Sequence, residues 1–384
     1  MIYLDNSATT PVSDAVIRRM EDVMRHTWGN PSSAHGLGLR ASDVMNISRR
    51  DILAALGVKA PSALDHPRLI FTGSGTEANN LALFGVAYTR REARFTPRMV
   101  ISADQHPSVL ETAKRLEKSG VEIVYLPTAG GEIRPADVAE AVDRNTILIS
   151  VMLVNNETGA VYDVRKLFGI ARAKNPGIVT HCDAVQGFMH VRGFSPDACG
   201  CDMTVISAHK LRGPKGIGAL YLSKEALKSR RLSPYILGGG QENGMRSGTE
   251  NLPAIAGFAE AVKNGFDIAG LESLRQRFIA GLPEEIKYKP TPSPAPHIIN
   301  ITLPGIKSET MLHFLSAREI YVSAGSACST PSRNVSNALL RYGASERDAD
   351  CSLRVSLSDI NTEADIDAAL AALREGVSTL ARTE

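Results

Sequence analysis

The sequence predicts an α/β protein in which a large domain with a mainly parallel sheet is joined to a smaller α+β domain. From about residue 68 to residue 222, short β-branched runs alternate with longer helical patterns, which is typical of βαβ units. After Asn251 the pattern changes to a long helical stretch, and a proline-rich break at Pro290–Pro296 precedes a strand-like run. At roughly 150 residues per domain, a chain of 384 residues has room for both units.

The strands of the large domain are expected where short apolar runs are bounded by turn residues. These runs are Arg68–Thr72, Arg98–Ser102, Val121–Leu126, Thr146–Val154, Gly177–His181 and Asp202–Ser207. Pro107 suits a helix start, and the apolar residues that follow it recur at helical spacing. The sequence therefore predicts a helix directly after His106, which places His106 at a strand-to-helix corner.

The smaller domain is expected to begin near the strand-like run His297–Leu303 and to end in a helix. Apolar residues in that last helix recur at steps of three and four, at Ile366, Leu370, Leu373, Val377 and Leu380. One apolar face of this kind predicts packing against a core rather than a cofactor site.

Composition and charge exclude several classes of protein. The chain has 43 Lys and Arg against 41 Asp and Glu, a net charge of +2, with both signs spread along the sequence, so nucleic acid is not expected as the main partner. Met1–Asp5 has no basic region before an apolar stretch, and the apolar run Ile147–Val154 is far shorter than the roughly 20 residues of a bilayer span. We expect no membrane association and a cytoplasmic location. Five cysteines without a secretion signal make a disulfide framework improbable and leave room for a working thiol.

Thr72–Glu77 is a glycine-rich turn that joins a predicted strand to a predicted helix. The free N–H groups and the positive end of the helix dipole at such a turn suit a phosphate. The Lys-Ser/Thr of a nucleotide P-loop is missing, so binding of a nucleoside triphosphate is poorly supported. Taken alone, the turn is as well explained by tight chain reversal as by phosphate binding.

Two further polar groups follow predicted strands. Asp183 comes directly after a strand, with Gln186 three residues on; in isolation, a helix cap explains this aspartate equally well. Ser207-Ala-His-Lys210 follows the last strand of the alternating region. A lysine at an interior strand end rarely stays charged and unpaired, and Schiff-base chemistry uses such a residue.

A lysine for a Schiff base, an aspartate for a pyridinium nitrogen and a glycine-rich helix start for a phosphate are together the three attachment points of pyridoxal 5′-phosphate. Here the chain resembles the NifS/IscS-like cysteine desulfurases, within the class V aminotransferase superfamily, over nearly its whole length. The matching stretches, in family order, are Tyr3–Pro11, Gly29–Ser32, Asn155–Glu157, Asp183–Gln186, Ser207–Lys210, Gly238–Gly240, Met245–Thr249 and Gly325–Cys328.

The resemblance implies the fold of type I pyridoxal-phosphate enzymes. Residues 15–256 are expected to form the large cofactor-binding domain, and residues 1–14 with 257–384 the small domain that carries the catalytic cysteine loop. By the same resemblance, Lys210 forms the Schiff base, Asp183 pairs with the ring nitrogen, Gln186 bonds the ring hydroxyl and His106 stacks on the ring. The residues expected to hold the phosphate are Gly75, Thr76, Ser207 and His209, with Thr249 from the neighbouring subunit of a homodimer.

For the substrate, the resemblance implies that Asn156 and Arg354 bind the carboxylate of L-cysteine, since a guanidinium fork suits two oxygens. Cys328 lies in a run of small residues that is expected to be mobile, as a thiol that carries sulfur away requires. Cys182 and Cys351 are expected to be buried and inert. Cys199-Gly-Cys201 lacks the spacing and the second pair of a zinc site, so these two are expected to be structural and no metal is expected.

The activity implied is conversion of L-cysteine to L-alanine with a persulfide left on Cys328, and with Lys210 and His106 as the other catalytic residues. The sulfur would serve iron–sulfur cluster, thio-cofactor or tRNA biosynthesis through an acceptor protein. Alternatives are a selenocysteine lyase, another class V aminotransferase-type enzyme, or a non-catalytic sulfur-carrier protein on a decayed fold. The chain ends at Glu384, soon after its last predicted helix and without the extended tail by which housekeeping members dock a scaffold, so the acceptor is left open.

Overall fold

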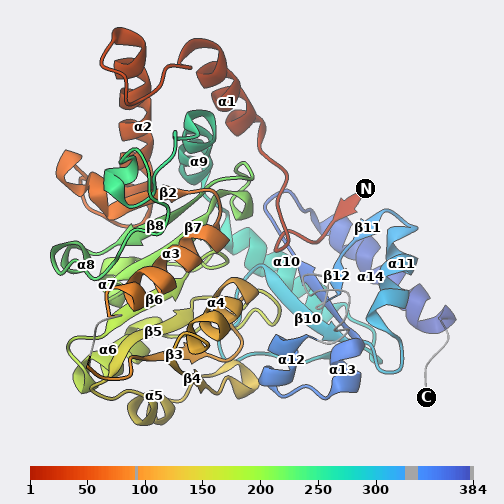
Figure 1. Ribbon diagram of the computed structural model, residues 1–384. Helices are drawn as coiled ribbons and strands as arrows, with labels where there is room; N and C mark the ends of the chain where they lie inside the picture. Colours follow the sequence, from red (N-terminus) through yellow and green to blue (C-terminus); the bar gives the residue numbers. More distant parts are fainter. Residues whose placement is uncertain (91–93, 325–335, 381–384) are drawn as a thin grey trace.

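The computed structural model describes residues 1–90, 94–324 and 336–380, and its largest feature is a seven-stranded sheet (Figure 1). Neighbouring strands run in the order β2-β8-β7-β6-β5-β3-β4. Most pairs are parallel, but β8 is antiparallel to both of its neighbours. The strands are β2 (Leu69–Thr72), β3 (Arg98–Ser102), β4 (Glu122–Leu126), β5 (Thr146–Met152), β6 (Val179–Asp183), β7 (Met203–Ser207) and β8 (Gly218–Leu222).

Helices cover both faces of this sheet, which explains why the residues of its central strands β6 and β7 are all buried. Every residue of β5 is buried. One core cluster joins the sheet to α3 (Gly75–Tyr88) and α4 (Pro107–Glu117). The other core cluster joins it to α5 (Pro135–Ala141), α6 (Val164–Lys174) and α9 (Leu252–Asn264), and α9 in turn packs on α1 (Asp14–His26) and α2 (Gly36–Ala55).

A second, antiparallel sheet lies beside the first and has the strand order β12-β13-β10-β9. Its strands are β9 (Lys287–Tyr288), β10 (Ile298–Thr302), β12 (Ser323–Ala324) and β13 (Ser352–Ser356). Its core includes side chains of α10 (Ile268–Ala280), α11 (Ser308–Ser316) and α14 (Glu363–Thr379), and also Leu4. Residues near both ends of the chain, Leu4 and those of α14, therefore share one core. In addition, β1 (Ile2–Tyr3) pairs with β11 (Ile320–Tyr321).

The remaining helices are short and lie between the larger elements. They are α7 (Pro196–Cys199), α8 (Lys224–Lys228), α12 (Asn337–Tyr342) and α13 (Glu346–Asp350), together with four 3₁₀ turns, η1 (Ala63–Arg68), η2 (Ala129–Gly131), η3 (Ala208–Lys210) and η4 (Glu242–Gly244), in the described part of the chain.

The α/β fold with a mainly parallel sheet is confirmed, and so is the helix after His106, which is α4. The apolar face of the last helix is confirmed as core at Ile366, Leu370, Leu373 and Val377, but Leu380 lies just beyond the helix end and is only partly buried. Thr362 with Asp365 forms a capping box that starts the helix. Some boundaries were wrong: the fourth predicted strand stops at Met152, and the fifth is shifted to Val179–Asp183. The domain boundaries stay a prediction.

None of the helices in the described ranges is both long and apolar enough to cross a bilayer. In the same residues, no group of three or more His, Cys, Asp or Glu side chains is placed to hold a metal ion. Cys182, Cys201 and Cys351 are buried free thiols, and Cys199 is partly exposed.

Candidate active site

A cavity of about 270 Å³ lies beyond the carboxyl ends of β6 and β7, beside the start of α3. This is where ligands bind in open α/β sheets. Nearly all residues predicted for the site line it: Gly75, Thr76, His106, Asn156, Asp183, Gln186, Ser207, His209, Lys210 and Arg354. The structure thus brings together predicted residues that are up to 279 positions apart in the sequence, between Gly75 and Arg354.

The first residue of α3, Gly75, has no side chain, so its backbone borders the cavity directly. A Cβ at Gly75 would lie 3.0 Å from Val185 Cγ2 and 3.5 Å from Ser207 Cβ, so a larger residue would fill the cavity or push on its wall. The first N–H groups of a helix have no partner within it. Ser207 Oγ is buried and has no hydrogen-bond partner in the described part of the chain. Together these donors make a site for an anion.

Lys210 ends the 3₁₀ turn η3, which follows β7. Its Nζ donates to the carbonyl oxygens of Ser7 (2.5 Å) and Ala8 (2.8 Å). Gln186 Nε2 donates to the same Ser7 oxygen at 2.9 Å. The lysine amine is therefore held inside the cavity by the backbone of Ser7 and Ala8, in the segment Asp5–Thr10.

His209 contacts that segment as well, since its Nδ1 lies 3.2 Å from Thr9 Oγ1. Burial lowers the pKa of His209 to about 4, and the charges of Lys210 and Lys215 act in the same direction. The ring is accordingly neutral at physiological pH and can interact with an anion only through a hydrogen bond.

Asp183 is the last residue of β6 and is 5% exposed. Its Oδ1 accepts from the backbone N–H of Val185 at 3.0 Å, and its Oδ2 accepts from Asn79 Nδ2 at 2.7 Å. The alternative of a helix cap is wrong, because the chain after Asp183 forms turns and the next described helix, α7, begins only at Pro196. The carboxylate instead faces the cavity with two fixed donors.

His106 is the N-cap residue of α4. Its Nδ1 lies 2.8 Å from Ser108 Oγ and accepts from the backbone N–H of Ser108 at 3.1 Å. Burial lowers the pKa of His106; the carboxylate of Asp183 opposes this effect and the charge of Lys210 adds to it.

Arg354 belongs to β13 of the second sheet and is only 3% exposed. Its guanidinium donates to the carbonyl oxygen of Asn156 at 2.9 Å and to Asp5 Oδ1 at 2.8 Å. The predicted neighbourhood of Asn156 and Arg354 is thus present, with the backbone of Asn156 making the contact. Asp5 is an internal counter-ion that the sequence did not reveal.

Two predicted residues are not among those that line the cavity. Thr249 is exposed and does not contribute to it within this chain. Cys328 lies outside the described residues.

Asn79 and Ser108 line the cavity but were not predicted. Asn79 could have been found, because it is a polar residue one helical turn after Gly75 and therefore lies on the same face of the helix. Asp5 had no such local signal, since Arg354 is 349 positions away.

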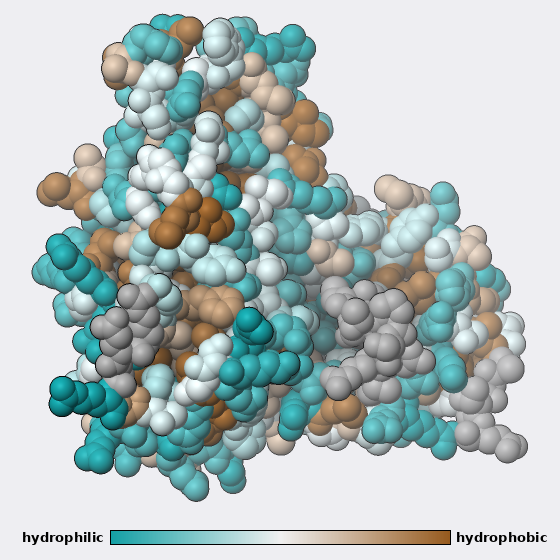
Figure 2. Space-filling view, in the orientation of Figure 1, coloured by the Kyte–Doolittle hydropathy of each residue, from teal (hydrophilic) through white to brown (hydrophobic). Residues whose placement is uncertain are grey.

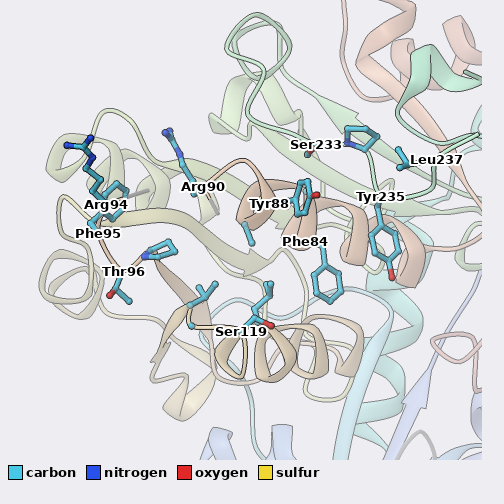
Figure 3. A pocket seen from close by; sticks show the side chains of 17 residues that line it. Phe84, Tyr88, Arg90, Arg94, Phe95, Thr96, Ser119, Ser233, Tyr235 and Leu237 are labelled. Atoms are coloured by element: carbon cyan, nitrogen blue, oxygen red, sulfur yellow. The ribbon is translucent and has the colours of Figure 1, made fainter. Parts of the chain in front are cut away.

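A larger cavity, of about 1050 Å³, lies at the other end of α3 (Figure 3). Phe84 and Tyr235 stack on its wall with ring centroids 5.5 Å apart, and Tyr88, Arg90 and Leu237 also line it. It contains none of the residues predicted for the site, so its size does not make it the reactive centre.

The sequence matches the aminotransferase class-V family model over residues 2–369. A NifS/IcsS protein homolog of Lactobacillus delbrueckii subsp. bulgaricus is 36% identical over 98% of this chain and 97% of its own. Cysteine desulfurase IscS of Methanosarcina thermophila is 35% identical over 99% of this chain and 92% of its own. A solved structure described as a NifS-like protein superposes with a TM-score of 0.89 at 33% identity, over 99% of this chain and all of that one. The protein therefore belongs to the aminotransferase class-V family, among its NifS- and IscS-like members.

Proposed function

We propose that the protein is a pyridoxal-phosphate-dependent cysteine desulfurase that converts L-cysteine to L-alanine and leaves the sulfur as a persulfide on Cys328. One observation carries this: the Lys210 amine, the Asp183 carboxylate and the side-chain-free start of α3 line one cavity, with the Arg354 guanidinium in its wall. The names of the IscS and NifS relatives agree with that activity.

The residues present fit the cofactor. Its phosphate would be held by the N–H groups of Gly75 and Thr76 and by Ser207 Oγ, which has no partner in the described part of the chain. Asp183 would face its ring nitrogen, and the Lys210 amine would be its point of covalent attachment. The residues proposed to contact the phosphate and ring from the remaining sides are His106, Gln186, His209 and, from a second subunit, Thr249.

When bound, the cofactor supplies an electron sink that allows bonds at Cα and Cβ of the amino acid to break. The chain's own groups do the rest. The Lys210 amine would take the Cα proton of the substrate, and the Asp183 carboxylate would stabilise a positive charge on the ring nitrogen. His106 would lie beside the substrate and can donate a hydrogen bond near its sulfur.

Arg354 and Asn156 orient the substrate by its carboxylate, and the thiolate of Cys328 forms a bond to the substrate sulfur as the bond from that sulfur to Cβ breaks. Turnover requires that the persulfide sulfur be removed from Cys328, either by an acceptor protein or by a thiol reductant.

We further propose that the active unit is a homodimer, because Thr249 is exposed in its own chain. Apolar side chains exposed on or next to α1 and α2 support a covering partner: Ile17, Met24, Trp28, Leu39 and Ile47. Figure 2 shows brown, apolar residues among polar ones over these helices, at the top of the view.

The function is tested by adding L-cysteine to the purified protein and measuring alanine and sulfide, with and without a thiol reductant. A cysteine desulfurase forms alanine and releases sulfide mainly when the reductant is present, because the sulfur otherwise stays on the protein. Alanine formed without any protein persulfide would instead indicate a lyase, and a protein with no yellow cofactor absorbance would argue against an enzyme of this class.

Asp183→Asn is expected to keep the cofactor but slow alanine formation by on the order of 10²-fold, roughly 3 kcal/mol. A neutral amide no longer stabilises a protonated ring nitrogen, while the contacts to the phosphate remain. Cofactor content by absorbance and single-turnover rates measure the two effects separately. Turnover close to that of the wild type would reduce Asp183 to a local turn residue.

Arg354→Ala is expected to raise the KM for L-cysteine roughly 30-fold or more, because losing one partner of a buried charged pair typically costs about 2–5 kcal/mol. Arg354→Lys should recover only part of this, since an ammonium cannot form the bidentate contact. Steady-state kinetics provide the measurement, with thermal unfolding as a check on the stability lost with the ion pair between Arg354 and Asp5. An unchanged KM would place Arg354 outside the substrate site.

A further inference from the structure

A continuous chain of hydrogen bonds connects Asp183 to His106 through two residues to which no role has yet been given. Asn79, on α3 and 1% exposed, donates from Nδ2 to Asp183 Oδ2 at 2.7 Å and to Ser108 Oγ at 2.9 Å. A carboxylate only accepts, so the amide nitrogen must be the atom that faces it. Both amide hydrogens are then used, and Oδ1 has no hydrogen-bond partner within the described residues.

The two hydrogen bonds that Asn79 donates determine which atom donates in the contact between Ser108 and His106. Ser108 Oγ accepts a hydrogen from Asn79, and its own single hydrogen is free to point at His106 Nδ1, which is 2.8 Å away. The backbone N–H of Ser108 points at the same nitrogen from 3.1 Å. His106 Nδ1 therefore faces two donors, and the hydrogen of the neutral ring must lie on Nε2.

We propose that Asn79 and Ser108 are positioning residues that couple His106 to Asp183 and hold His106 as a neutral ring with its hydrogen on Nε2. The catalytic consequence rests on the proposed function. A ring in this form presents Nε2–H as a donor to a molecule in the cavity. Protonation to an imidazolium would place a hydrogen on Nδ1, where it would face the two donors of Ser108.

The charges around the ring are compatible with this assignment. The ionisable groups that face His106 are Asp183 at the end of β6 and Lys210 and His209 in the turn after β7. Burial lowers the pKa of His106. The Asp183 carboxylate by itself would favour an imidazolium at His106. The Asn79 amide lies between this carboxylate and Ser108, and it donates one hydrogen to each of them.

The test is ring ¹⁵N spectroscopy of the holoenzyme labelled with ¹⁵N-histidine, with the His106 signals assigned by their loss in His106→Gln. At pH 7.5 the wild type is expected to show hydrogen on Nε2 and none on Nδ1. Asn79→Ala and Ser108→Ala should each lower the share of this tautomer and reduce kcat about tenfold, the equivalent of one hydrogen bond. Asn80→Ala, the same change at the next position of α3, should alter neither.

The double variant shows whether Asn79 and Ser108 act on His106 through one series of hydrogen bonds or independently of each other. If Asn79 acts on His106 only through Ser108, then adding Asn79→Ala to Ser108→Ala should change the ring signals no further. A wild-type ring with hydrogen on Nδ1, or ring signals unmoved in both single variants, would overturn the proposal. An Nε2–H ring in a protein that forms no alanine from L-cysteine would overturn the proposed function instead.

Discussion

Cys328→Ser is expected to reduce sulfide release from L-cysteine to background while the yellow cofactor absorbance and substrate binding persist. A serine hydroxyl is far less ionised than a thiol and cannot take up the sulfur as a persulfide. The groups that line the cavity are untouched by this change, so the spectral response to cysteine should remain. Measurement of sulfide with reductant, next to absorbance spectra before and after cysteine, separates the two halves of the reaction.

Mass spectrometry gives the positive form of the same prediction. After cysteine treatment, the wild type should carry added sulfur on the peptide that contains Cys328 and on no peptide with Cys182, Cys199, Cys201 or Cys351. Cys199→Ser is the matched control, because Cys199 is a partly exposed thiol outside the cavity and its loss should leave sulfide release unchanged. Near-normal sulfide release by Cys328→Ser would instead favour a lyase.

The same variant also discriminates between cysteine and selenocysteine as substrates. A selenol is more acidic than a thiol, and selenium can leave without a thiolate acceptor. Cys328→Ser is therefore expected to retain activity toward selenocysteine while losing it toward cysteine.

Lys210→Ala is expected to abolish alanine formation, with a loss on the order of 10²–10⁴-fold from the missing proton transfer alone. The phosphate and ring contacts would remain, so the cofactor should still bind, but borohydride reduction should no longer fix it to the protein. Peptide mapping after reduction of the wild type should find the modified residue at position 210.

Lys215→Ala is the control for that experiment. Lys215 is near enough to lower the pKa of His209, yet it does not line the cavity. Its loss should leave the fixed cofactor in place and raise the pKa of His209. If reduction placed the cofactor on Lys215 or any other lysine, the role proposed for Lys210 would have to be abandoned.

Much of this architecture could be predicted because the informative signals are local. The strand–turn–helix at Thr72–Glu77 and the strand end at Lys210 can each be recognised from a few consecutive residues. The rule that ligands bind beyond the carboxyl ends of parallel strands then brings separate motifs to one edge. The antiparallel direction of β8 was not predictable in this way, because pairing direction depends on the path of the loop that follows Lys210.

The contacts that complete the site depend on tertiary structure and left no local trace. Asp5 stands in a segment with no helical or strand periodicity, and its partner Arg354 comes from the other sheet. The two carbonyl oxygens that hold Lys210 belong to Ser7 and Ala8, and a backbone oxygen carries no sequence signature at all. A side chain such as Asn79 is recoverable in principle, since helical spacing places it beside Gly75.

The segment from Asp5 to Thr10 also dictates when during biosynthesis the site can exist. Asn6 Nδ2 donates to the carbonyl oxygen of Ser356, 350 positions later, and the backbone N–H of Ser7 donates to Ser356 Oγ. At roughly 5–20 residues per second, a ribosome adds Ser356 on the order of tens of seconds after Asn6. Until then the segment has only its contacts to the large domain, such as the bond from the Thr10 N–H to the carbonyl oxygen of His209, and lacks its contacts to the second sheet. The complete cavity, with Arg354 in its wall, is therefore expected to form only after the second sheet has been synthesised.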